Sequence, residues 1–269
     1  MRIAIVAPLM FAIASASSPS FADSAPPSFA GGYFGLNAGA AWSSSRYATD
    51  PGCPPQPVDA VFCNAPDPSS VNGDAVAASG TGDLSSAGFT GGVQGGYNWQ
   101  NGNVVFGGEA DFGAFDFSTS ASPAGVFPFV FAGTTYALSE SATAQWLATL
   151  RGRLGYAVTP DLLIYGTGGI AFTDFEFSSR YADNANGVGL PGGAGFTSRS
   201  RFMVGWTLGA GGEWLMDRNW SIKAEYLYVD FGSMNFPVAV SNTPAFTQTM
   251  VIDADLSSQV ARIGINFRP

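Results

Sequence analysis

Residues 200–232 constrain the fold of this chain most tightly, because two long runs of alternating residues meet there at a tight turn, residues 216–219. Alternate residues of an extended strand point to opposite sides, so each run predicts a β-strand with one apolar face. The apolar faces consist of Phe202, Val204, Trp206, Leu208, Ala210 and Trp214 on the first strand and of Trp220, Ile222, Ala224, Tyr226 and Tyr228 on the second. A soluble hairpin can alternate in this way too. Strands of this length, with aromatic residues at the ends of the apolar face and charges on the other face, are more typical of a boundary between lipid and a polar lumen.

The composition of the whole chain also favours a membrane-spanning sheet. Aromatic residues make up 14% of the chain, glycine is abundant, and only 12% of residues are charged, which is low for a soluble domain. No run of apolar residues is long enough for a transmembrane helix. A β-barrel resolves this combination, because it distributes its apolar residues in alternation. The formal net charge of −9 argues against a nucleic-acid partner, which would select for basic patches.

Seven connections of alternating length predict how the strands are wired. The expected strands are residues 33–43, 88–99, 104–117, 143–158, 162–177, 200–215, 220–232 and 256–267. The expected long connections are 44–87, 118–142, 178–199 and 233–255, and short turns lie between them. We therefore predict an all-β, eight-stranded antiparallel up-and-down transmembrane β-barrel with long extracellular loops and short periplasmic turns. Ten strands remain an alternative if part of the first or second long connection pairs.

The N-terminus has the pattern of a secretory signal peptide. Met1-Arg2 supplies a positive region, residues 3–14 form an apolar core, and residues 20–22 give a small-x-small cleavage site. We expect a signal peptide at 1–22, a periplasmic lead-in at 23–32 and the barrel at 33–269. A permanent anchor helix is the alternative, but the apolar core is short for one.

Cys53 and Cys63 are the two cysteines of the chain and bracket a proline-rich loop. Export places them in an oxidising compartment, so we expect a disulfide between them. Such a bond contributes about 2–3 kcal/mol by loop entropy, chiefly to the order of the loop. Two thiols without a histidine make a poor metal site, and we expect no metal.

The polar faces of the expected strands carry charges of both signs at one level of the lumen. These residues are Glu109, Asp111, Glu213 and Glu225, and Arg151, Arg153, Lys223 and Arg262. An eight-stranded barrel has an interior just wide enough for its own side chains, and charge is tolerated there only when it is paired. We interpret the set as a structural ion-pair network, and a gated narrow pore lined by the same residues is the alternative. If the network holds the barrel together, Arg153→Ala should lower the unfolding temperature.

Several enzyme classes are disfavoured because the chain has no histidine. Serine hydrolases and acyltransferases that need a histidine base lose that base, and neither a G-x-S-x-G elbow nor a P-loop is present. Haem ligation would need Tyr or Met. We expect no enzymatic activity and no cofactor. The aspartates of the first long connection match no calcium-binding loop and are interpreted as solvated acidic surface.

Aromatic residues beside the three short turns predict a girdle at one membrane interface. They are Trp99, Tyr156, Trp214 and Trp220. A soluble barrel that buries these rings under a second sheet is the alternative, and the sequence supplies no such layer.

Three segments carry a resemblance to a known family. GYNWQNGNVVFGGEADF, RGRLGYAVTPDLLIYGTGGIAF and GAGGEWLMDRNWSIKAEYLYVDFG resemble the opacity-type, OmpA-like small outer-membrane barrels of Gram-negative bacteria, in particular the immunogenic 25–31 kDa surface proteins of the "porin family". The resemblance extends from about residue 33 to the end. It implies an eight-stranded barrel in the cell outer membrane, surrounded by outer-membrane lipids and inserted by the barrel-assembly machinery. The family usually ends on an aromatic residue, so Phe267 is implied as the assembly signal, displaced by two positions.

Together these observations predict a non-enzymatic integral outer-membrane protein with a structural role in the envelope and a surface antigen in its loops. A narrow porin for small solutes is the first alternative. A surface adhesin or haem-binding protein that acts through its loops is the second.

Overall fold

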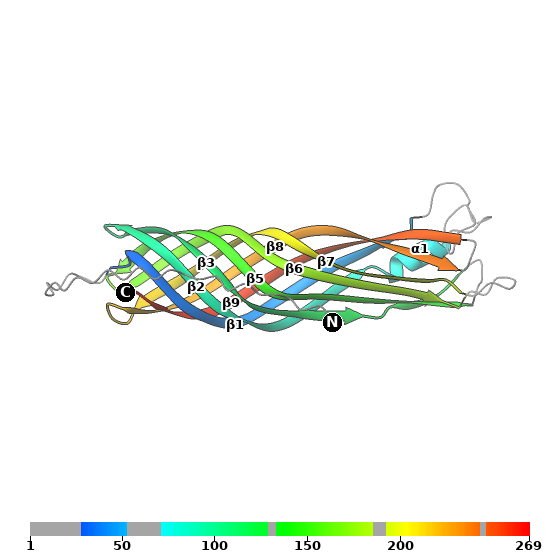
Figure 1. The fold of residues 1–269 in the computed structure, drawn as a ribbon, viewed down its shortest axis with the longest axis horizontal. Coiled ribbons are helices and arrows are strands. Elements are labelled where there is room, and N and C mark those ends of the chain that lie inside the picture. The colour runs from blue at the N-terminus through cyan, green and yellow to red at the C-terminus, as the bar shows by residue number, and fades with distance from the viewer. Residues whose placement is uncertain (1–27, 53–70, 129–132, 185–191, 243–245) are drawn as a thin grey trace, which may run out of the picture.

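The chain forms one closed antiparallel β-sheet, drawn in Figure 1 as an elongated barrel with oblique strands. The computed structural model describes residues 28–52, 71–128, 133–184, 192–242 and 246–269. In this part of the chain the elements are β1 (Gly31–Asp50), α1 (Val71–Ser79), β2 (Gly82–Asn101), β3 (Val104–Ala121), β4 (Ala124–Val126), β5 (Thr135–Thr159), β6 (Leu162–Asp183), β7 (Ala194–Leu215), β8 (Trp220–Asn242) and β9 (Phe246–Phe267). Neighbouring strands pair in the order β3-β2-β1-β9-β8-β7-β6-β5-β4, and a further pairing of β3 with β5 closes the ring. The predicted all-β, up-and-down barrel class is confirmed.

The two ends of the barrel differ in their connections. Gly102–Asn103, Pro160–Asp161 and residues 216–219 link strand pairs at one end, named here the short-turn end. The opposite end, named the long-connection end, carries α1 (Figure 1). It also carries β4, which pairs with the start of β5. The sequence predicts eight long strands, and β4 adds a three-residue strand that pairs with β5. It lies in the second long connection, where the sequence leaves extra pairing open as an alternative.

An apolar band on the outer wall explains why these sequences form a barrel. On β6, the outward residues Leu162, Ile164, Ile170 and Phe172 are apolar, and the next outward residue is Asp174. Ten residue steps at the usual rise and tilt make this band about 25 Å tall, the height of a lipid-facing belt. Exposed members on several strands include Phe34, Leu36, Phe89, Val93, Leu150, Leu154, Leu208 and Ile263. We call this surface the outer apolar band.

Beyond the band the apolar residues lie on the inward face and the polar residues on the outward face. This arrangement overturns part of the sequence prediction. Phe175, Phe177 and Tyr181 point inward on β6 and are fully buried, whereas Glu176 and Arg180 point outward and are exposed. Such strands bury apolar residues inside and show polar residues to water, as in a soluble barrel. The strands therefore continue well past their predicted ends. The expected long connections were too long, because strands take up the ends of each of them: 44–50 and 82–87 of 44–87, 118–121 and 135–142 of 118–142, 178–183 and 194–199 of 178–199, and 233–242 and 246–255 of 233–255.

A large apolar core fills the barrel at the long-connection end. It includes Phe117, Leu138, Phe177, Phe236, Val238, Ile252 and Leu256. The helix α1, which the sequence analysis did not predict, contributes the fully buried Val76 to this core. The Tyr136 hydroxyl anchors its backbone by donating to the Ala75 carbonyl oxygen at 2.7 Å. Thr49 Oγ1 donates to the carbonyl oxygen of Gly80, the residue that follows the helix, at 2.6 Å.

Two predictions fall outside the described residues. The signal peptide at 1–22 and the pair Cys53 and Cys63 lie in segments that the structure does not describe, so both stay predictions. Among the helices that are described, none is both long and apolar enough to cross a membrane.

Candidate functional site: a buried charge network in the barrel

The register of the strands places the predicted lumen charges at the same height along the barrel axis. Glu109 of β3 faces Arg151 of β5, Glu213 of β7 faces Lys223 of β8, and Glu225 of β8 faces Arg262 of β9 in the ladders. All eight predicted lumen residues are buried, and the side chains of Arg151 and Lys223 are completely enclosed. Alternation fixes the inward direction and pairing fixes the level, so the residues converge without any irregular backbone.

Arg151 is the centre of the network. Its Nη2 lies 2.5 Å from Glu109 Oε1 and 2.9 Å from Asp111 Oδ2, and its Nη1 lies 2.9 Å from Glu225 Oε1. Its Nε also donates to Thr149 Oγ1 at 2.9 Å. The planar guanidinium thus meets three carboxylates, an arrangement that suits its fixed fork of donors.

Two further bases share these carboxylates. Lys223 Nζ donates to both oxygens of Glu109, at 2.6 and 2.7 Å, and lies 3.9 Å from Glu225. Arg262 Nη2 lies 2.9 Å from Asp111 Oδ2 and 2.8 Å from Glu225 Oε2. Each carboxylate of this group therefore keeps at least two basic neighbours, which offsets the desolvation of the buried charges.

A second group surrounds Glu213, nearer the short-turn end. Arg153 Nη2 and Arg268 Nη2 each lie 2.8 Å from a Glu213 oxygen, and Ser221 Oγ donates to Glu213 Oε1 at 2.7 Å. Arg153 also stacks its guanidinium over the Tyr165 ring at 3.9 Å.

Tyr33 joins the two groups. Its hydroxyl donates to Glu109 Oε2 at 2.8 Å and accepts a hydrogen bond from Arg153 Nη1 at 3.0 Å. Sequence reasoning missed Tyr33 and Arg268. The signal for Arg268 was its position, since it follows Arg262 and Asn266 on the inward face of the last strand.

An apolar layer closes the lumen below the charges at the short-turn end. Phe29, Val105, Ala157, Leu163, Tyr165 and Leu215 form it. Arg268 Nη1 donates to the Phe29 carbonyl oxygen at 2.7 Å and so ties the end of β9 to the lead-in. The charge network is therefore enclosed between this layer and the large core at the other end.

The predicted girdle residues lie on the outer wall beside the short turns. Trp99, Tyr156, Trp214 and Trp220 are all largely exposed. Trp214 Nε1 donates to Asp161 Oδ2 at 2.9 Å, and Trp99 stacks on Phe106 at a centroid distance of 5.6 Å. These positions suit an interfacial belt, in which amphipathic rings sit at headgroup level.

Phe267, the implied assembly signal, is the last residue of β9. Its ring lies 5.5 Å from the Phe34 ring and 5.1 Å from the Trp220 ring, between centroids. It therefore stands on the outer wall at the short-turn end. Its role in assembly stays a prediction.

Glu140 is a buried carboxylate outside the network and outside the outer apolar band. It lies on β5 in the apolar core of the long-connection end and is 1% exposed. Ser179 Oγ donates to its Oε1 at 3.0 Å, and its Oε2 has no hydrogen-bond partner among the described residues. Burial raises the pKa of Glu140 to about 7.

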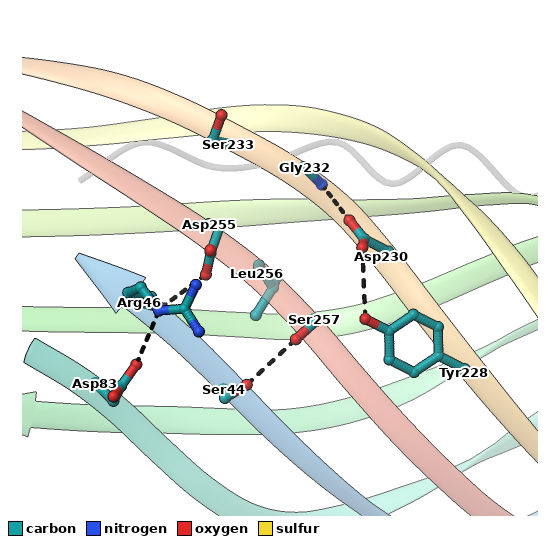
Figure 2. A pocket seen from close by; sticks show the side chains of 10 residues that line it. All are labelled: Ser44, Arg46, Asp83, Tyr228, Asp230, Gly232, Ser233, Asp255, Leu256 and Ser257. Atoms are coloured by element: carbon teal, nitrogen blue, oxygen red, sulfur yellow. Dashed lines mark hydrogen bonds and ion pairs between the residues drawn. The ribbon is translucent and has the colours of Figure 1, made fainter. Parts of the chain in front are cut away.

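A groove of about 410 Å³ lies on the outer wall across β1, β2, β8 and β9, beyond the outer apolar band. Figure 2 shows Arg46 in this groove between Asp83 and Asp255. Arg46 Nε lies 3.4 Å from Asp83 Oδ1, with both side chains at least 70% exposed, so the ion pair contributes little. The described residues contain no cluster of metal-ligating side chains here or elsewhere. The groove therefore lacks the buried polar groups of a built ligand site.

Comparisons with known proteins agree with this architecture. Residues 4–268 match the family described as outer membrane protein beta-barrel domain. The 31 kDa outer-membrane immunogenic protein of Brucella melitensis biotype 1 is 33% identical over 257 residues, which covers 94% of this chain and 90% of that protein. The 22 kDa outer membrane protein of Rhizobium leguminosarum bv. viciae is 32% identical over 154 residues, 57% of this chain and 58% of that protein. The solved structure of the outer membrane protein OprG from Pseudomonas aeruginosa aligns with 89% of this chain and 97% of its own, with a TM-score of 0.45 and 13% identity.

Proposed function

Because the chain belongs to the outer-membrane protein β-barrel family, we propose that it is a closed, non-enzymatic barrel that supports the outer membrane and displays a surface antigen. In this proposal the short-turn end faces the periplasm and the long-connection end faces the outside. The relatives named as immunogenic outer-membrane proteins support the antigen role.

The observation that carries the proposal is the filled interior. From the short-turn end, an apolar layer around Phe29 is followed by the charge network and then by the large core around Phe236. A solute would have to separate Arg151 from three carboxylates and then pass an apolar core. Water-filled porins are wider and keep their lumen polar throughout.

The absence of histidine supports the non-enzymatic part of the proposal. The buried carboxylates are paired with bases, and a carboxylate held in this way is a poor general base. Among the described residues Glu140 forms no salt bridge, and it is buried in the apolar core of the long-connection end.

Osmotic swelling of proteoliposomes tests the closed lumen. Refolded protein should give no swelling above empty vesicles with glycerol or small sugars, whereas a general porin reconstituted in parallel should swell. Swelling that scales with the amount of folded protein would favour the narrow porin instead.

The structural role is tested in the native bacterium. Loss of the chain should raise sensitivity to detergents that cross a weakened outer membrane, and expression of the native chain should restore resistance. Unchanged sensitivity in the deletion strain, together with no growth defect under osmotic stress, would contradict the structural role.

A further inference from the structure

The barrel wall opens between β7 and β8 just beyond the outer apolar band. The ladder pairs Trp206 with Asp230, and the next pair is Gly195 with Val240. Residues 196–205 of β7 and 231–239 of β8, all of them described, have no pairing with each other. β7 stays paired with β6 throughout this interval, and β8 stays paired with β9 except at a short irregularity.

The sequence of β8 explains the opening. The ladder to β9 shifts register between Asp230 and Ser233, and Gly232 adopts a positive φ of 70° there. A bulge of this kind bends a strand and increases its twist. Pro237 follows, and it has no N–H to donate to a neighbouring strand, so proline is found at sheet edges.

Behind the opening the barrel remains sealed. Phe177 of β6 and Phe236 of β8 contact each other directly, at a centroid distance of 4.8 Å, and Phe175 lies 6.3 Å from Phe236. Rings of β6 and β8 therefore meet on the lumen side of the unpaired stretch of β7, so the opening does not lead into the lumen.

This geometry leaves two arginines in an unusual position. Arg199 and Arg201 lie on the inward face of β7, where they pair with the inward residues Phe177 and Phe175 of β6. Both arginines are nevertheless exposed, because β8 does not pair with β7 at this level. Within the described residues neither forms a salt bridge, in a chain whose formal net charge is −9. Asp174 and Glu176, two carboxylates of the neighbouring strand β6, lie on its outward face.

Those two carboxylates are already engaged. Ser200 Oγ donates to Asp174 Oδ1 at 2.7 Å, and Ser198 Oγ donates to Glu176 Oε1 at 3.1 Å. Strand alternation directs them away from the face that carries the two arginines.

The level of the arginines relative to the membrane indicates what they meet. Phe202, next to Arg201, and Trp206 are exposed aromatic residues at the edge of the outer apolar band. Arg199 lies two residues beyond Arg201, about 7 Å farther from the band along the strand. Guanidinium groups at this height lie among lipid headgroups, and their paired donors match the oxygens of a phosphate.

We propose that Arg199 and Arg201 form a binding site for the phosphate of an anionic lipid headgroup in the leaflet at the long-connection end. The inference rests on the membrane placement in the proposed function but not on a closed lumen. Phe202 and Trp206 mark the level of the acyl region on the outward face of β7. The two arginines lie on the other face of β7, beside the stretch that β8 leaves unpaired.

Lipid retention in detergent tests the site. The refolded protein in a neutral detergent is mixed with equal amounts of phosphatidic acid and phosphatidylcholine, and bound lipid is measured by native mass spectrometry. The native chain should retain phosphatidic acid preferentially. Arg199→Gln and Arg201→Gln should each lower this preference about fivefold, the effect of one basic residue at a charged lipid surface, and the double variant should abolish most of it.

The control is Arg218→Gln, an exposed arginine in the turn at the short-turn end. It should leave the preference unchanged, and heat-modifiable gel mobility should show that every variant is folded. No preference in the native chain, or an unchanged preference in the double variant, would overturn the proposal. Inorganic phosphate is added at the same concentration as a competitor, and complete displacement of the lipid by it would identify a free-phosphate site instead. If vesicles that contain the protein swell in the solute assay while the preference for phosphatidic acid is normal, the closed lumen is refuted and the lipid site is not affected.

Discussion

Replacing Glu225 by glutamine tests the charge network at one of the two carboxylates that have three basic neighbours. Glu225 lies 2.9 Å from Arg151, 2.8 Å from Arg262 and 3.9 Å from Lys223. Glutamine keeps the shape but removes the charge, so four acids and five bases in the lumen become three acids and five bases. Loss of one partner from a buried ion pair costs about 3–5 kcal/mol. Because Glu225 serves three bases, we expect Glu225→Gln to lower the free energy of unfolding by about 4 kcal/mol.

A double-mutant cycle shows whether charge balance is the cause. Arg151→Met removes a base, and Glu109 and Asp111 keep Lys223 and Arg262 as partners. The double variant Glu225→Gln/Arg151→Met has three acids and four bases, the same net charge of +1 as the native lumen. It should therefore lose less stability than the sum of the single variants, by about 1–3 kcal/mol.

The measurement is equilibrium unfolding in urea of the refolded protein in phosphatidylcholine vesicles, followed by tryptophan fluorescence. Glu176→Gln is the matched control, because Glu176 is exposed on the outer wall and accepts one hydrogen bond from Ser198. It should change stability by less than about 0.5 kcal/mol. If Glu225→Gln behaves like this control, or if the effects of the two lumen substitutions are additive, paired charges do not stabilise the barrel.

Three further changes test other layers of the barrel. Burial raises the pKa of Glu140 to about 7, whereas in the unfolded chain this carboxyl has its ordinary pKa of 4.5. Between these two pH values the folded protein therefore binds a proton that the unfolded chain has released. Stability should fall as pH rises from about 4.5 to about 7, and Glu140→Gln should remove this slope in unfolding experiments at pH 5 and pH 8. Phe236→Ala should cost about 3–5 kcal/mol in urea unfolding through the cavity left beside Phe177, and a cost below 1 kcal/mol would contradict the tight core. Gly39→Ala should impair refolding, scored by heat-modifiable mobility, because its methyl group would collide with the Ala261 carbonyl oxygen; efficient refolding would count against the close approach of β1 and β9 at this position.

The membrane-spanning half of the fold was predictable, because the alternation of apolar and polar residues and the positions of the charges both indicate which side chains face the lumen. Trp206 and Leu208 mark the lipid side of β7, and Glu213 marks the lumen side of the same strand. Antiparallel register then places Glu213 opposite Lys223. The charge network follows from these two local rules, without knowledge of distant contacts.

Contacts made by the chain ends could not be predicted in the same way. Tyr33 and Glu109 are 76 residues apart, and Arg268 is 239 residues from Phe29. Nothing local in either segment indicates these partners. They depend on closure of the ring, which brings β1 and β9 together.

The strand segments beyond the outer apolar band were not predicted, because their outward residues are polar and their inward residues apolar, the reverse of the pattern in the band. Phe175 and Phe177 continue the alternation of β6, but polar residues take over the outward positions at Asp174. The predicted strand therefore ends at Phe177, and residues 178–183 of β6 are left out. The inward rings show that the strand continues, and that information was available in the sequence.

Single-channel conductance in a planar bilayer measures directly whether the lumen is closed. The refolded native chain should give no reproducible current steps, while heat-modifiable mobility shows that the inserted protein is folded. Stable current steps of reproducible size, whose ion selectivity changes in Glu225→Gln, would show that ions pass through the charge network and that the lumen is open.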